Sequence, residues 1–248
     1  GDIYTAYTFA RNEQGAKLLD ESGAWKRSGT YEKVGSIQPD ILGGFSTTLT
    51  YKNFSLSAVI DGRFGGDIAS LSYNYGMYAG TLKSSLRGRT EEYGGLKRTL
   101  EDGRVVYDGM IPDGVFDQGI VINGTDVSGM SYQEAYEKGL VQPIAASQYY
   151  DNLYSWGTGI REAAVMDCSW IALREIALRW NMPKAWYSKA HLENVTLGVS
   201  VRNIGYLYNS LPDNIHPEGL PSNRSSAFVE GGGPAYSRTY GVNINVAF

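Results

Sequence analysis

The fold is decided by an alternating stretch at the end of the sequence, Arg238-Thr239-Tyr240-Gly241-Val242-Asn243-Ile244-Asn245-Val246-Ala247-Phe248. Successive side chains of a β-strand point to opposite faces, so apolar residues at every second position indicate a strand with one apolar face. The apolar set consists of Tyr240, Val242, Ile244, Val246 and Phe248. The residues between them are small or polar. This segment therefore predicts a long amphipathic strand.

Two earlier segments repeat the alternation as pairs of strands. Between residues 45 and 60, two alternating runs flank Lys52-Asn53, and two runs joined by two residues predict a hairpin. A second hairpin is predicted over residues 169–202, where Pro183 ends the first strand because proline cannot donate to the ladder. A weaker strand is expected over residues 3–9. The sequence thus predicts an all-β, antiparallel meander.

The composition narrows the class of protein. The 248 residues include 31 glycines and 19 tyrosines, which favour strands and turns over helices. No run approaches 18 apolar residues, so a transmembrane helix is excluded. The net charge of −4, with no basic run, argues against a nucleic-acid partner. The single cysteine, Cys168, leaves no internal disulfide and no cysteine-ligated metal site.

The connections between the predicted strands are of two lengths. The turns at 52–53 and near 183–189 are short, whereas residues of about 65–167 and 203–237 form long connections. Short turns at one end and long loops at the other are typical of outer-membrane barrels. Within the first long loop, Ser131 and Glu134 form a capping box that predicts a short helix over residues 132–138.

The alternation has two interpretations. A soluble antiparallel sheet also alternates, with one face on a core; a secreted carbohydrate-binding protein is the alternative of this kind. The transmembrane interpretation is favoured because the strands approach the roughly 9–11 residues that cross a tilted barrel wall. Aromatic residues at the strand ends, such as Phe54 and Trp180, suit the interfacial girdles of a barrel. The opposite faces are polar, as a wet interior requires.

Several motifs resemble one family, the SusC/RagA-like TonB-dependent outer-membrane transporters. The terminal strand resembles the signal that the barrel-insertion machinery recognises. The other matching motifs, in chain order, are Gly35-Ser36-Ile37-Gln38-Pro39-Asp40 with Gly43-Gly44-Phe45, Tyr51-Lys52-Asn53-Phe54-Ser55-Leu56, Asp61-Gly62-Arg63-Phe64-Gly65-Gly66-Asp67-Ile68, Leu173-Arg174-Glu175-Ile176-Ala177-Leu178 with Pro183, Val201-Arg202-Asn203-Ile204, and Pro217-Glu218. The family's "QNL"-like triplet appears here as Arg202-Asn203-Ile204, and the first long loop follows no family pattern.

The resemblance implies a location and a role. Residues 1–248 would form the C-terminal part of one barrel of about 22 strands in the bacterial outer membrane. The family's plug domain and TonB-contacting segment are absent from the sequence. With no signal peptide at Gly1, the chain is expected to be a piece of a longer protein. The whole protein would import oligosaccharides or peptides with a SusD-like surface lipoprotein and energy from the TonB complex. No enzyme activity and no cofactor are expected.

Candidate site residues fall into three groups. The insertion signal comprises Tyr240, Val242, Ile244, Val246 and Phe248. Lumen-facing candidates are Asp61, Glu175, Arg179 and Arg202. Substrate- or lid-facing candidates are Tyr149, Tyr150, Tyr154 and Trp156, although ordinary loop packing is the better interpretation of this cluster.

Two pairs of acidic residues allow further interpretations, as a catalytic pair or as a Ca²⁺ site. Asp61 with Glu175 has the residue types of a catalytic carboxylate pair, although lumen-lining polar residues are the better interpretation. Asp113 with Asp117 lies in a glycine-rich turn that suits either Ca²⁺ or solvent.

Overall fold

The computed structural model describes residues 1–220, 227–233 and 237–248 and divides into two compact units. The first, which we call the mixed unit, comprises Gly1–Ile37, Asp67–Met166 and Leu220–Gly232. The second, which we call the sheet unit, comprises Gln38–Gly66, Asp167–Gly219 and Gly233–Phe248. Each unit is assembled from segments that lie far apart in the sequence.

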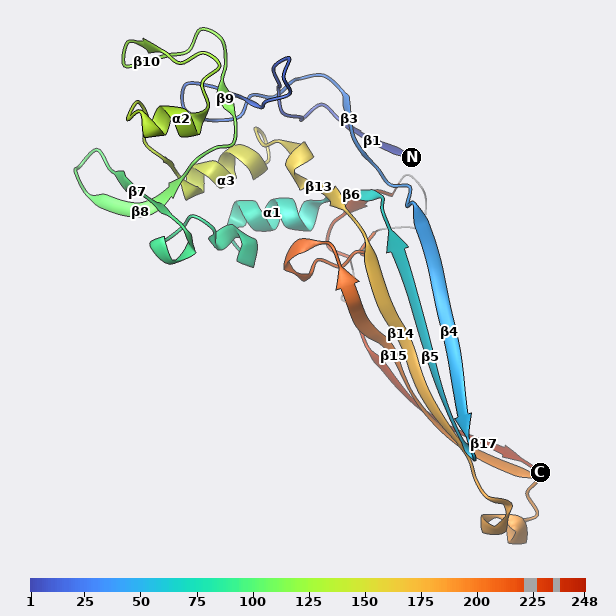
Figure 1. Cartoon of the computed structure of the whole chain (residues 1–248). Helices are drawn as coiled ribbons and strands as arrows, with labels where there is room; N and C mark the ends of the chain where they lie inside the picture. The colour runs from blue at the N-terminus through green and yellow to red at the C-terminus, as the bar shows by residue number, and fades with distance from the viewer. Residues whose placement is uncertain (221–226, 234–236) are drawn as a thin grey trace. The chain divides into compact units, whose positions relative to one another are not determined.

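The sheet unit contains one antiparallel five-stranded sheet in the order β17-β15-β14-β5-β4 (Figure 1). Its strands are β4 (Ile41–Tyr51), β5 (Phe54–Phe64), β14 (Trp170–Asn181), β15 (Asn194–Asn209) and β17 (Thr239–Ala247). Both predicted hairpins are present, and the terminal strand pairs with β15.

The β4–β5 hairpin turns at Lys52-Asn53, as predicted. Tyr51 pairs with Phe54, and Lys52 adopts a φ of 51°. The β14–β15 connection is longer and contains two short 3-10 helices, η4 (Lys184–Trp186) and η5 (Ser188–Ala190). Pro183 lies between the end of β14 and η4, at a position where the sheet needs no backbone N–H donor.

The strand β15 runs beyond the residue at which a loop was expected to begin. It continues through Asn209, whereas the sequence placed a loop from about residue 203. The register shifts opposite this stretch, and Asn203 and Gly205 have φ values of 52° and 148°. The irregularity interrupts the two-residue alternation, and the sequence pattern therefore ends there although the strand does not.

A β-bulge lies in the centre of the sheet at Arg174. Leu173 pairs with Ile60 and Glu175 pairs with Val59, so Arg174 is the extra residue of β14. Such an insertion bends a strand and changes which face its later residues reach. Beyond the bulge, Glu175 lies opposite Arg202 of β15.

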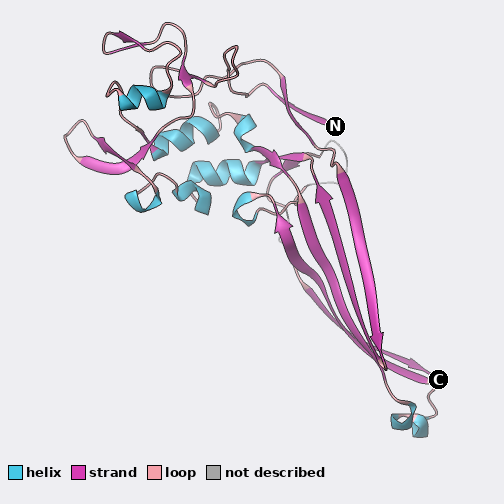
Figure 2. Ribbon diagram, viewed as in Figure 1, coloured by secondary structure: helices cyan, strands magenta, loops and turns pink. Residues whose placement is uncertain are grey.

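The mixed unit combines short strands with helices. Its strands are β1 (Asp2–Thr5), β2 (Leu18–Leu19), β3 (Glu32–Ser36), β6 (Asp67–Ser70), β7 (Leu96–Thr99), β8 (Val105–Met110), β9 (Val115–Phe116), β10 (Val121–Ile122), β11 (Thr125–Asp126), β12 (Ile144–Ala145), β13 (Val165–Asp167, its last residue in the sheet unit) and β16 (Val229–Glu230). Its helices are α1 (Leu71–Ala79), α2 (Tyr132–Glu137) and α3 (Ala146–Tyr154), cyan in Figure 2, with 3-10 helices η1 (Lys83–Leu86), η2 (Glu91–Tyr93) and η3 (Arg161–Ala164). A further 3-10 helix, η6 (Pro212–Asn214), belongs to the sheet unit.

The predicted first strand over residues 3–9 was wrong in extent and in partner. The strand β1 covers only Asp2–Thr5 and pairs with β3, outside the five-stranded sheet. Ile3 is buried and Tyr4 is exposed, which preserves the alternation, but the chain after Thr5 turns away to make a single bridge at Phe9. Alternation over four residues does not specify which sheet a strand joins.

The segment expected as one long loop is largely folded around a hydrophobic core. Phe116, Leu19, Val127 and Ile160 are completely buried there, together with residues of α2 and α3. The predicted helix over 132–138 is confirmed as α2, where the Ser131 hydroxyl accepts a hydrogen bond from Glu134 N–H at 3.1 Å. Helices α1 and α3 were not predicted. Among the described residues, no helix has the length and apolar character required to cross a membrane.

Candidate functional site

The five-stranded sheet carries an apolar face that continues across every strand. Register aligns its side chains in transverse rows, for example Leu49–Leu56–Leu178–Val199–Val242 and Tyr51–Phe54–Trp180–Leu197–Ile244. These side chains are largely solvent-accessible: Leu49 is 67% exposed and Val242 is 81% exposed. The face therefore packs against nothing within the described structure that would remove it from solvent.

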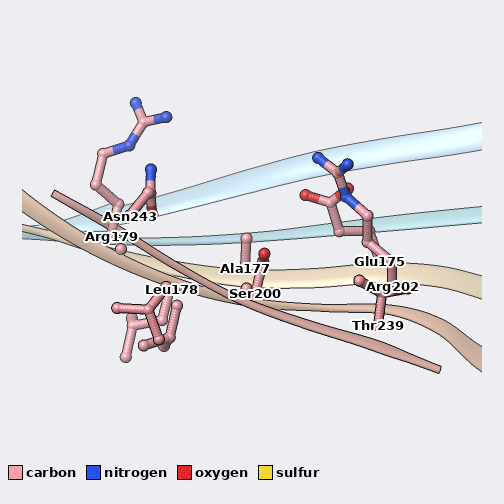
Figure 3. A pocket seen from close by; sticks show the side chains of 12 residues that line it. Glu175, Ala177, Leu178, Arg179, Ser200, Arg202, Thr239 and Asn243 are labelled. Atoms are coloured by element: carbon pink, nitrogen blue, oxygen red, sulfur yellow. The ribbon is translucent and has the colours of Figure 1, made fainter. Parts of the chain in front are cut away.

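The opposite face is polar. Its rows include Thr48–Ser57–Ala177–Ser200–Gly241, Thr50–Ser55–Arg179–Gly198–Asn243 and Ser46–Val59–Glu175–Arg202–Thr239. Figure 3 shows the separation directly, because Arg179 and Asn243 project from one side of the sheet and Leu178 projects from the other. The sheet is thus divided into an apolar face and a polar face.

The four lumen-facing candidates all lie on this polar face. Arg202 Nε donates to Glu175 Oε2 at 2.9 Å, and Asp61 Oδ1 accepts from Arg174 Nε at 2.6 Å. Each carboxylate therefore has a guanidinium partner, which favours a polar wall over a catalytic pair. Arg179 makes no ion pair with any described residue. That this face borders a lumen stays a prediction.

A cluster that the sequence did not reveal fixes the loop after β15 to the polar face. Arg174 donates to both carboxylate oxygens of Glu218, at 2.8 Å each. Tyr206 of β15 donates to Glu218 Oε2 at 2.6 Å, and its hydroxyl lies 3.0 Å from Nδ1 of His216. Bidentate arginine–carboxylate pairs are stronger and more directional than single hydrogen bonds. Arg174 thereby links β14, β5 and the loop.

The charge state of Glu218 follows from these contacts. Burial by itself would raise the pKa of this carboxyl group. The hydrogen bonds from Arg174 and Tyr206 stabilise the carboxylate more than burial disfavours it, and the pKa of Glu218 is held below its usual range. In the sequence, this contact was indicated only by the Pro217-Glu218 motif together with Arg174 in the middle of a predicted strand.

The chain has solved counterparts. It matches a chain of the RagAB peptide transporter with a TM-score of 0.51 and 12% identity, covering 100% of this chain and 22% of that chain. It also matches a chain of the RagAB peptide importer in the "open-open" state, with a TM-score of 0.50 and 13% identity over 100% of this chain and 22% of that chain. No protein-family model matches the sequence. No curated protein matches it either.

These comparisons establish likeness of fold. The chain spans less than a quarter of the length of the two solved chains. The sequence identities are low, and the shared property is therefore the arrangement of the backbone.

The predicted insertion signal is arranged as the alternation required. Tyr240, Val242, Ile244 and Val246 face Val201, Val199, Leu197 and Val195 of β15, on the apolar face. Phe248 follows the last residue of β17 and is exposed. The recognition of this strand by an insertion machinery stays a prediction.

Three of the four aromatic candidates are packed within the mixed unit. Tyr150 and Tyr154 lie buried in the core of the mixed unit, and Tyr149 packs edge-on against Trp25 with ring centroids 5.0 Å apart. Burial raises the pKa of all three hydroxyls. Ordinary packing accounts for these tyrosines, because Tyr150 and Tyr154 lie on successive turns of the buried side of α3 and Tyr149 packs beside them. Trp156 alone of the four is exposed, at 70%, and it stacks on Tyr75.

The two aspartates considered for Ca²⁺ are each engaged by a lysine. Asp113 Oδ2 lies 3.1 Å from Lys17 Nζ, and Asp117 pairs with Lys26. Hydrogen bonding to Lys26 lowers the pKa of Asp117. Two ion-paired carboxylates on separate turns do not form the converging oxygen cage that Ca²⁺ takes.

Proposed function

We propose that this chain forms part of a SusC/RagA-like TonB-dependent transporter of the bacterial outer membrane. The five-stranded sheet supplies a stretch of barrel wall, with its apolar face toward lipid and its polar face toward the lumen. The observation that carries the proposal is the exposed apolar surface spanning all five strands in register. Soluble proteins rarely expose contiguous apolar surface of this extent.

Strand length and charge distribution support a lipid-facing role. The strands contain 11, 11, 12, 16 and 9 residues. A tilted strand needs about 9–11 residues to cross the hydrocarbon region. The rows of the apolar face hold no Asp, Glu, Lys or Arg among the paired residues. A charge at mid-depth on a lipid face costs about 2–4 kcal/mol, so such exclusion is expected.

The role that we propose for the whole protein is active transport. The whole protein imports oligosaccharides or peptides, with a SusD-like surface lipoprotein as partner and TonB-derived energy delivered through regions outside this chain. The likeness of fold to two RagAB chains, which belong to a peptide transporter, supports this reading and favours peptides. Neither enzyme activity nor a cofactor is part of the proposed role.

A membrane-insertion experiment tests the proposal against a soluble carbohydrate-binding protein. The chain is expressed alone, and its partition between buffer, detergent micelles and lipid vesicles is measured. We expect it to require detergent, because β4 and β17 leave unpaired edges and the apolar face is open to water. A monodisperse protein that melts cooperatively without detergent would overturn the proposal.

A further inference from the structure

The polar face contains a hollow of about 330 Å³ bordered by β14, β15 and β17 (Figure 3). Its centre is the row Ala177–Ser200–Gly241, in which every side chain is small. Larger side chains border it on both sides, in the rows Glu175–Arg202–Thr239 and Arg179–Gly198–Asn243. The hollow exists because a row of small residues lies between the longer side chains of Glu175 and Arg202 on one side and of Arg179 and Asn243 on the other.

The charge balance of the hollow is positive. Glu175 and Arg202 neutralise each other through their 2.9 Å hydrogen bond. Arg179 forms no ion pair among the described residues and projects from the same face. One arginine therefore remains uncompensated at one border of the hollow. An unpaired guanidinium presents a fork of donors that matches a carboxylate.

Gly198 places a second polar group beside Arg179. It pairs with Arg179 on one side and with Asn243 on the other. A Cβ on Gly198 would lie 2.1 Å from Oδ1 of Asn243, so the amide lies across the glycine in space that any other residue would occupy. Arg179 and Asn243 consequently face each other with no side chain between them (Figure 3).

We infer that this hollow binds a carboxylate group of a ligand, with Arg179 as its charged contact and Asn243 as a neighbouring hydrogen-bond donor. The inference rests on the proposed function, since it assigns the polar face to the path of an imported solute. A peptide C-terminus and a uronic acid both present this group. Ser200 lies within the same hollow and offers a hydroxyl to the rest of the ligand.

Four probes test the inference on the full chain in detergent micelles. N-acetyl-trialanine and trigalacturonate supply the carboxylate from the two sources, and N-acetyl-trialanine amide and fully methyl-esterified trigalacturonate are their neutral counterparts. Calorimetry or chemical-shift titration gives the dissociation constants. We expect at least one acid to bind and its neutral counterpart to bind at least tenfold more weakly. The acid that binds identifies the source.

Matched variants locate the contact. Arg179→Gln is expected to weaken binding of the acid at least tenfold, and Gly198→Ala to weaken it by displacing Asn243. Arg104→Gln is the control, because Arg104 is an exposed arginine in the mixed unit. Far-UV circular dichroism checks that each variant retains its strands.

Three outcomes overturn the inference: equal binding of an acid and its neutral counterpart, no binding of any probe, or unchanged binding by Arg179→Gln. The failure of the proposed function is distinct, since it appears as a chain that needs no detergent, and the same titrations can then be run in buffer.

Discussion

Arg174 of β14 donates through Nε to Oδ1 of Asp61 on β5 at 2.6 Å, and it does so from the extra residue of the β-bulge. In a regular strand, residues 174 and 175 would point to opposite faces of the sheet. Arg174 could then not contact Asp61 on the same face on which Glu175 contacts Arg202. The bulge thus allows two consecutive charged residues to use the same face. Its second consequence is the bidentate contact to Glu218, which fixes the loop.

Removal of the guanidinium should release that loop. Arg174→Met leaves Asp61 and Glu218 without their shared partner, and hydrogen bonds to charged groups contribute about 1.5–3 kcal/mol. The single cysteine reports the release, because Cys168 is completely buried and its Sγ lies 3.4 Å from the Pro217 carbonyl oxygen. We expect maleimide labelling of Cys168 to accelerate by roughly tenfold or more.

The control for this measurement is Arg104→Met, which removes an exposed ion pair with Asp102. Exposed pairs contribute about 0–1 kcal/mol, so the labelling rate of Cys168 should not change. Equal rates in Arg174→Met and the parent chain would show that the loop is held by other contacts.

Acid should release the same loop. Because the folded-state pKa of Glu218 is lowered, its contribution is complete above the ordinary carboxyl pKa of 4.5 and is lost as the pH falls through the lower folded value. Amide exchange over residues 210–219, corrected for intrinsic rates, should be slow at pH 7 and faster below about pH 4. In Glu218→Gln this acid-dependent component should be absent, and its persistence would assign it to another group.

Adjacent residues on β4 distinguish the two faces. Phe45 lies on the apolar face and Ser46 on the polar face, both exposed near the middle of an 11-residue strand. Phe45→Lys should reduce the folded, vesicle-inserted fraction, with a cost of about 2–4 kcal/mol at mid-depth. Ser46→Lys should leave it nearly unchanged. Heat-modifiable migration on gels measures the inserted fraction.

The soluble alternative predicts no penalty for either lysine variant. In water, a lysine at an exposed position is neutral or favourable for solubility. Insertion of both variants at the parental level would therefore contradict a lipid-facing β4.

Two aromatic residues separate packing from surface function in the mixed unit. Tyr154→Ala removes a buried ring and should lower the free energy of unfolding by about 3 kcal/mol. Trp156→Ala, at an exposed position, should lower it by about 0.5 kcal/mol. Urea unfolding followed by near-ultraviolet circular dichroism measures both. Trp156→Ala is then the appropriate variant for solute uptake and lipoprotein association, and unchanged values of both would remove Trp156 from the candidates.

The sheet was predictable wherever a strict two-residue alternation met a short turn. The β4–β5 hairpin satisfies both conditions. The strand β17 follows a long connection and was recognised from its alternation alone, and Ser131 marked the start of α2 through its hydroxyl. Prediction failed where tertiary contacts override the local pattern. Helix α1 has a Ser70 cap but no Glu or Gln three residues later to complete a capping box, and α3 begins at Ala146 after an N-cap residue, Ala145, that offers no side-chain hydrogen bond.

The site was predictable only in part. The alternation within each predicted strand assigned the four lumen-facing candidates to one polar face. These residues are Asp61, Glu175, Arg179 and Arg202. The Arg174–Glu218 contact joins residues 44 positions apart through a loop, and no periodicity encodes it. The role of the tyrosines of α3 could not be assigned from the sequence, because clustering in sequence does not distinguish an inward helix face from an exposed loop.

The bulge at Arg174 acts on β14 as a one-letter insertion acts on a reading frame. Each residue of β14 after the bulge lies on the face opposite to the one that strict alternation along the sequence would predict. Deletion of Arg174 would remove the bulge and leave Leu173 and Glu175 opposite the consecutive residues Ile60 and Val59, so the residues after it would keep their faces. A one-residue deletion at a paired position between Glu175 and Asn181 would instead exchange the faces of the residues that follow it, whereas substitutions leave the faces unchanged.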